Sequence, residues 1–362
     1  MARPYTNHCT TTAYLCLGNG FVNKVFCFIF LFVSLLVYLS YAPKGLYVLL
    51  KNSPTMTDKT WEYIVKPAQP IPFSELEVVV TEGESLHFPL KRQEIQQSIL
   101  RYWDDVQQRM FMARSGEFTD ALAQKDEAKI KRMLNQVGGV HEKYRLTRAM
   151  LEDNKLYLAL SLTDYMSFAG TNERAIREPE FREMVMRYGI EDRCDANFYF
   201  ANPLAVCSVF YGYNTLGDDS SIYVPIGLRS DKVAIYPNVH HVVGGVIDVA
   251  KKGQQIDIAR HLKVELGEEM GVDATQMGEP LFYGIVRQIP SRMPEVVCGI
   301  PIYVGQEELM RRWKEKAPGK FEHRNLSFYR VCEIPEFLEK HGGSMVPSGA
   351  AALTIFLEQQ KL

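Results

Sequence analysis

The chain has 362 residues, of which 46% are hydrophobic and 23% charged, a globular composition with enough length for two domains. Its 41 Lys and Arg against 43 Asp and Glu give a formal net charge of −2, so no global basic balance points to a nucleic-acid partner. The 7 cysteines form no Cys-x-x-Cys pair. This argues against zinc and thioredoxin-like chemistry and favours a reducing location, cytoplasmic or facing the cytoplasm.

Residues 1–56 differ in composition from the rest of the chain. No charged residue lies between Lys24 and Lys44, and the apolar run there is about long enough for one membrane span. Three interpretations stay open: a single-pass membrane anchor over residues 25–42, a signal peptide cleaved near Ala42, or a translated start set too early, with Met56 as the true start.

Residues 57–217 are predicted to form a smaller α+β N-terminal domain. Apolar residues from Ile95 to Met110 recur at spacings of four, four, three and four, which predicts a helix. Further strands are expected over 75–80 and 155–162, and further helices over 118–134 and 179–188. Asn202-Pro203 is expected to form a turn or a helix start.

Residues 218–362 are predicted to form a second domain, an αβα sandwich with a mixed sheet. It is expected to open with a hairpin whose strands cover 221–228 and 232–235. Strands over 280–287, 296–304 and 326–331 and helices over 334–340 and 348–357 complete it.

The most informative stretch is an acidic helix expected between Val264 and Val272. Glu265, Glu268 and Glu269 are spaced so that they share one helix face. Like charges at this spacing repel, so the arrangement suits a bound cation such as Mg²⁺, which takes carboxylates together with substrate phosphates. A solvated acidic surface is the alternative interpretation.

The order of glycine pair, acidic helix, glycine and strand resembles the Nudix hydrolase family. Six residues fall on the family's sequence box in register: Glu265, Leu266, Glu268, Glu269, Gly271 and Val272. The box arginine is replaced by Val264, and the box's opening glycine and first glutamate would fall on Ala250 and Ile256.

A second resemblance extends over about residues 70–358. The run from Leu158 through Tyr165 to Asn172, the segment Tyr199–Leu204 and the segment Pro347–Ala351 look like the atypical Nudix branch that splits UDP-glucose and UDP-galactose into UMP and sugar 1-phosphate. That branch also lacks the box arginine and carries an N-terminal domain. The resemblance implies Mg²⁺ as cofactor and a nucleotide sugar as substrate. It implies Glu265 and Glu269 as the strongest ligands, with Glu268 facing solvent or a second ion.

Five residues are candidates for substrate binding. Gly244 and Gly245 lack Cβ atoms and would let phosphates approach the backbone, or they form a strand-end bulge. Arg287 would contact a phosphate or is a surface charge. Tyr165 and Asn172 would hold the nucleoside or belong to the core and to a helix cap. The alternative functions are a Nudix diphosphatase for ADP-ribose and a nucleotide-binding module without turnover. The oligomeric state is left open.

Overall fold

The computed structural model describes residues 60–83, 92–113, 124, 142–214, 221–233, 235–250 and 255–360. The N-terminal apolar segment and all but one residue of the helix expected over 118–134 lie outside these described residues. Within the described ranges, no helix has the length and apolar character needed to span a membrane.

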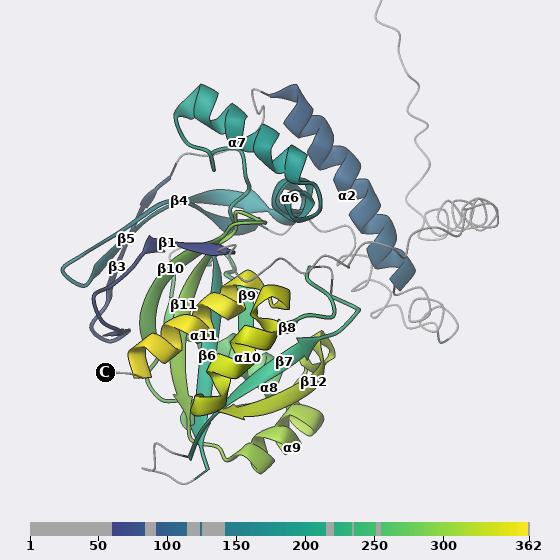
Figure 1. Ribbon diagram of the computed structural model, residues 1–362. Coiled ribbons are helices and arrows are strands. Elements are labelled where there is room, and N and C mark those ends of the chain that lie inside the picture. The colour runs from purple at the N-terminus through teal and green to yellow at the C-terminus, as the bar shows by residue number, and fades with distance from the viewer. Residues whose placement is uncertain are drawn as a thin grey trace, which may run out of the picture. The chain divides into compact units, whose positions relative to one another are not determined.

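A nine-stranded mixed sheet forms the centre of the fold (Figure 1). Its main path runs β1 (Trp61–Val65), β10 (Leu281–Gln288), β11 (Pro294–Ile302), β6 (Ala205–Tyr213), β7 (Ile222–Arg229) and β12 (His323–Arg330). The short strands β2 (Ile71–Pro72), β8 (His240–His241) and β9 (Val243–Val246) pair with β10, β7 and β6. β11 and β6 run parallel, whereas the other pairs are antiparallel.

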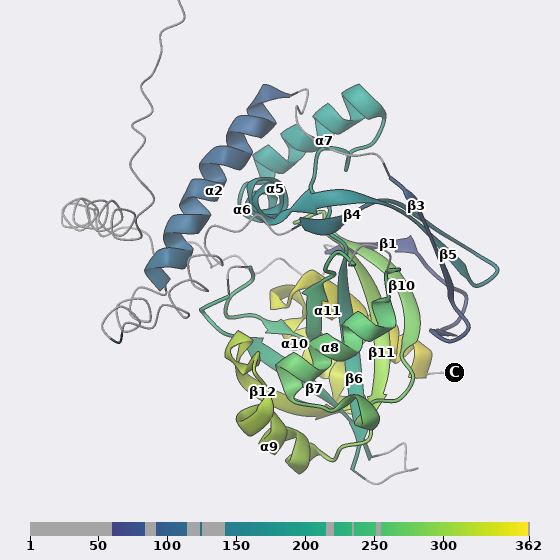
Figure 2. The same cartoon turned by 180° about the vertical axis from the view of Figure 1, so that it is seen from behind.

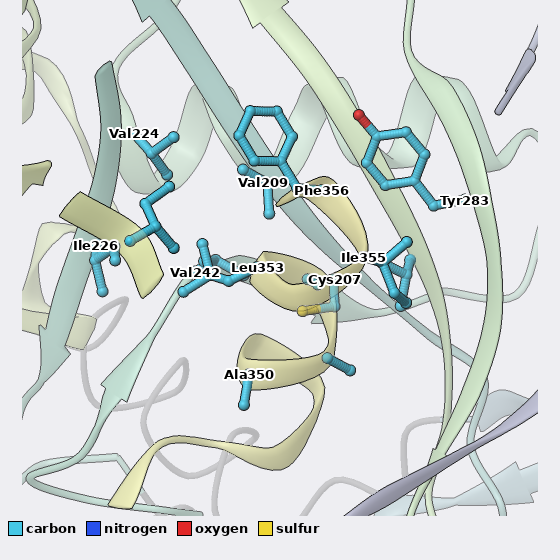
Figure 3. Close-up of a cluster of buried hydrophobic side chains, with 14 of the residues drawn as sticks. Cys207, Val209, Val224, Ile226, Val242, Tyr283, Ala350, Leu353, Ile355 and Phe356 are labelled. Atoms are coloured by element: carbon cyan, nitrogen blue, oxygen red, sulfur yellow. The ribbon is translucent and has the colours of Figure 1, made fainter. Parts of the chain in front are cut away.

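Helices cover both faces of this sheet. α11 (Pro347–Gln360) and α10 (Ile334–His341) lie on one face, and α8 (Ile258–Met270) lies on the other, as the two opposite views show (Figures 1 and 2). Figure 3 shows Leu353 and Phe356 of α11 among the strand residues Cys207, Val209 and Val224 in the core between helix and sheet. The mixed sheet and its helical layers confirm the predicted α/β architecture.

The N-terminal part adds a three-stranded sheet in the order β3 (Glu77–Glu82), β5 (Lys155–Asp164), β4 (Glu142–Glu152). α2 (Gln93–Ala113) and α7 (Pro179–Arg193) lie beside it (Figure 1). Between them the chain makes α5 (Tyr165–Phe168), the π-helical turn η1 (Ala169–Glu173) and α6 (Arg174–Arg177). α9 (Gln306–Lys316) and the 3₁₀ turns 274–276, 320–322, 331–333 and 342–344 complete the described elements.

One predicted strand is wrong, and several elements were not predicted. The described residues among 232–235 form a turn and bends instead of the second strand of a hairpin, because β7 pairs with β12, about a hundred residues further along the chain, and with the short β8. β4, β6 and α9 had no sequence prediction. β6 is buried along nearly its whole length, so it lacks the polar alternation that marks a strand with one face exposed to solvent.

The domain boundary at residue 217 remains a prediction. Strands from both sides of it meet in the large sheet, since β1, β2 and β6 precede it and the other strands follow it. Residues 53–362 form one compact unit.

The crossing of α2 over η1 yields a testable stability prediction. A Cβ at Gly170 would lie 2.3 Å from the Ile99 Cα atom, so the glycine allows the helix backbone to pass at this distance. We expect Gly170→Ala to lower the free energy of unfolding by about 1–3 kcal/mol, measured by urea denaturation. Gly343→Ala is the matched control, because no atom lies within 4 Å of its added Cβ. Equal stability of the two variants would contradict the prediction.

Candidate functional site

The local sequence defines both ends of α8, and its apolar residues determine which face packs against the sheet. The Asp257 side chain caps the first turn by accepting a hydrogen bond from the Arg260 amide at 2.9 Å. Gly271 ends the helix with a φ of 70°, a conformation that favours glycine. Four apolar residues at intervals of four form the buried stripe of the helix: Ile258, Leu262, Leu266 and Met270.

Glu269 is buried between this helix and the sheet, with its side chain 3% exposed. The amide of Gly244 donates to its Oε1 at 3.4 Å, and Nε2 of His323 lies 2.8 Å from its Oε2. Each carboxylate oxygen therefore has one partner, which leaves lone pairs on both oxygens for a further ligand.

Glu265 lies one helical turn earlier and meets the next residue of β9. A Cβ added to Gly245 would fall 2.5 Å from the Glu265 Cδ atom, so the absence of a side chain there makes room for the carboxylate. The glycine pair is thus part of the strand, paired with Val206 and Cys207 of β6, and not a bulge at its end. The two glutamates converge on two consecutive strand residues.

The negative charges at this place are largely uncompensated. Burial, and then the neighbouring Glu269 and Glu268, raise the pKa of Glu265 to about 8. Burial also raises the pKa of Glu269 to about 8, although Arg229 and the Gly244 amide act in the opposite direction. Asp248 and Glu322 add to the negative potential at Glu265. A cation bound here would relieve this repulsion.

Glu268 takes a different position, since it is exposed to solvent. Its charge still acts on both other glutamates. His261 Nε2 lies 3.2 Å from Glu265 Oε1, and burial lowers the pKa of this histidine. The structure therefore brings Glu265 and Glu269 together on β9, with Glu268 at the solvent side.

The residues fit a magnesium ion that shares its coordination with a substrate. Within the described ranges, no group of three or more His, Cys, Asp or Glu side chains is arranged to hold a metal ion. Glu265 and Glu269 supply two carboxylates, and Mg²⁺ usually binds one or two carboxylates plus phosphate oxygens and water. The hard oxygen donors suit this ion, with phosphate oxygens completing its coordination.

Sequence reasoning missed the groups on neighbouring strands that surround Glu269. His323 opens β12, and Arg229 ends β7 in register with it. The charge of Arg229 acts on Glu269, Glu295 and Glu322, and its buried Nε has no hydrogen-bond partner among the described residues. Nothing in the local sequence marks either residue, because they reach the site only through strand pairing.

Tyr165 shares a hydrophobic cluster with a residue of β9, whereas Asn172 forms hydrogen bonds within the core. Tyr165 packs with Phe168 at a ring-centroid distance of 5.9 Å, in a cluster that includes Val246 of β9. Asn172 is fully buried. Its Nδ2 donates to the Ser291 carbonyl at 2.8 Å, and its Oδ1 accepts from the Asn202 amide at 3.3 Å.

Arg287 is not beside the glutamates, because β11 and β6 separate its strand from β9. Its Nη1 lies 3.9 Å from Glu62 Oε1, and Arg292 shares that carboxylate at 3.0 Å. Burial and then the charge of Arg292 lower the pKa of Arg287 to about 10. A phosphate contact by Arg287 remains a prediction.

Comparison with known proteins finds only weak similarities to solved structures. No family model and no curated protein matches the chain. A mutT/nudix family protein from Listeria innocua is 12% identical, with a TM-score of 0.32, over 44% of this chain and 94% of that one. A C. elegans Ap4A hydrolase, solved as a binary complex, is 16% identical, with a TM-score of 0.23, over 42% and 98%.

A third solved structure, the T. brucei MERS1–RNA complex, is 12% identical, with a TM-score of 0.26, over 63% of this chain and 85% of that one. These similarities identify no branch of the family and no substrate.

The contact between Gly245 and Glu265 gives a direct structural prediction. In a crystal structure of Gly245→Ala, we expect the Glu265 carboxylate to have moved away from β9, because the new methyl group occupies its place. Gly267→Ala on the same helix is the control, since its Cβ would meet only the Val272 carbonyl at 3.4 Å. That variant should keep Glu265 in place and gain about 0.5–1 kcal/mol of stability. An unmoved Glu265 in Gly245→Ala would refute the steric argument.

Proposed function

We propose that the protein hydrolyses the diphosphate bond of a nucleotide sugar in a Mg²⁺-dependent reaction. The observation that carries the proposal is the convergence of Glu265 and Glu269 on the Gly244–Gly245 backbone with their charges uncompensated. UDP-glucose and UDP-galactose are the substrates that the sequence resemblance implies, with UMP and sugar 1-phosphate as products.

Glu265 and Glu269 would hold the magnesium ion, with Glu268 at the solvent side for a second ion or a water. When bound, Mg²⁺ neutralises phosphate charge and lowers the pKa of a coordinated water. Arg229 is the candidate to donate to a phosphate oxygen, because its buried Nε has no hydrogen-bond partner within the described residues. A planar guanidinium suits phosphate recognition.

The N-terminal part is proposed to hold the nucleoside. Tyr165, Phe168 and Val246, the residue that follows the glycine pair, belong to one hydrophobic cluster. A base stacked near these rings would place its diphosphate toward Gly245 and the glutamates. Asn172 would act indirectly, because its amide holds η1 against the turn at Ser291.

A nucleotide-binding module without turnover is the second candidate. It is favoured by one observation, that the described residues contain no complete protein cage for a metal ion. The two candidates differ in whether Mg²⁺ produces turnover, so a substrate panel containing UDP-glucose, UDP-galactose and ADP-ribose separates them.

The metal assignment predicts that replacing the Glu269 carboxylate by an amide lowers the hydrolytic activity. Glu269→Gln keeps the size of the side chain but removes its charge, so we expect kcat/KM for UDP-glucose with Mg²⁺ to fall by about 100-fold or more, equivalent to about 2.7 kcal/mol. Glu315→Gln, which removes an exposed carboxylate on α9, should leave the rate unchanged. Wild-type turnover in Glu269→Gln would show that the metal site lies elsewhere.

The nucleoside proposal predicts a preference for uridine. A site that hydrogen-bonds one base leaves its polar groups unpaired with another. We expect kcat/KM for UDP-glucose to exceed that for ADP-ribose by at least about tenfold, or about 1.4 kcal/mol. Both substrates are measured with one enzyme preparation. Equal or faster cleavage of ADP-ribose would favour a diphosphatase for ADP-ribose. If neither substrate is cleaved, the nucleotide-binding module without turnover is favoured.

A further inference from the structure

Glu269 receives its strongest hydrogen bond from outside its own helix. The residue at the arginine position of the box, Val264, is apolar and 45% exposed, and it can donate nothing to a carboxylate. His323 instead brings Nε2 to 2.8 Å from Glu269 Oε2, and both side chains are buried, at 0% and 3% exposed. Leaving a buried carboxylate oxygen without a hydrogen-bond donor would destabilise the fold, so the contact with His323 stabilises the buried position of Glu269.

The neighbouring strand is shaped to receive this imidazole. A Cβ at Gly227 would lie 2.1 Å from Nδ1 of His323, so only glycine leaves room for the ring at that position of β7. The pairing of β12 with β7 also shifts register between His323 and Asn325. A bulge of this kind re-aims a side chain, and bulges are frequent beside active sites.

We propose that His323 is a positioning residue that fixes the orientation of Glu269 toward the cation. This inference rests on the proposed Mg²⁺-dependent function. The imidazole holds Oε2 from the side of β12, and the Gly244 amide holds Oε1 from the side of β9. Groups on β12 and β9 therefore hold the carboxylate from two strands.

The hydrogen-bond pattern of the ring agrees with a donor at Nε2. Its Nδ1 has no hydrogen-bond partner among the described residues, which fits a tautomer with the proton on Nε2. The ring then donates from Nε2 to the carboxylate and fixes its orientation.

The test compares variants that keep or remove the donor. His323→Leu removes the hydrogen bond at similar size, whereas the amide of His323→Gln can place a nitrogen near the former Nε2. Mn²⁺ affinity is measured by EPR titration in the presence of UDP. Mg²⁺-dependent kcat and KM are measured with UDP-glucose. For His323→Leu we expect Mn²⁺ affinity and kcat to fall by about 10–100-fold, with KM for UDP-glucose within about threefold of wild type.

His323→Gln should recover most of the Mn²⁺ affinity and most of the kcat that His323→Leu loses. His240→Gln is the control. His240 lies on β8 and packs against Phe337 and His341, so its loss should leave Mn²⁺ affinity and kcat unchanged. Thermal melts monitored by circular dichroism establish that each variant is folded. If His323→Leu does not fold, His323→Asn takes its place, because its amide is too short to reach Glu269.

The outcomes separate this inference from the proposed function. If wild-type protein neither binds Mn²⁺ nor cleaves UDP-glucose, the proposed function fails and the positioning role fails with it. If wild-type protein does both and His323→Leu matches it, the positioning role alone is wrong. It is also wrong if His323→Gln loses as much as His323→Leu, because the donor would then not be the cause.

Discussion

The burial of Glu269 between α8 and the sheet is the constraint on which the candidate site depends. Removing a carboxylate from water is expensive unless it is hydrogen-bonded or paired with a cation. The chain supplies two donors, from Gly244 and His323, and the nearby charge of Arg229. The raised pKa shows that these groups compensate only part of the cost. A bound cation would offset the remaining cost, as the proposed Mg²⁺-dependent chemistry requires.

The glycines near the site are explained by the same close packing. Gly245 makes room for Glu265, and Gly227 makes room for His323. Gly349, near the start of α11, makes room for His241 in the same way, because a Cβ there would lie 2.7 Å from its Nδ1. In each case the missing side chain lets a polar group approach a backbone.

A buried polar network connects the N-terminal part to the sheet and to α11. Asn172 donates to the carbonyl of Ser291, whose hydroxyl donates to Gln288 at 2.9 Å. Gln288 in turn contacts Glu295 and donates to Ser348 at 3.2 Å. These hydrogen bonds connect three segments that lie far apart in the chain: the segment that ends at Asn172, the stretch from Gln288 to Glu295, and Pro347–Ala351. The segment from Tyr165 to Asn172, where the nucleoside is proposed to bind, is thereby held against the turn at Ser291.

The sequence by itself determined the elements whose signal is local. The spacing of Glu265 and Glu269 fixed their shared helix face, the stripe beginning at Ile95 predicted α2, and Gly271 marked a helix end. It did not determine β6, because a strand buried on both faces shows no alternation, nor the partner of β7, because β12 lies far along the chain. Only the tertiary structure brought His323 and Arg229 to Glu269. Strand pairing sets those contacts, and its register depends on the whole sheet and not on neighbouring residues.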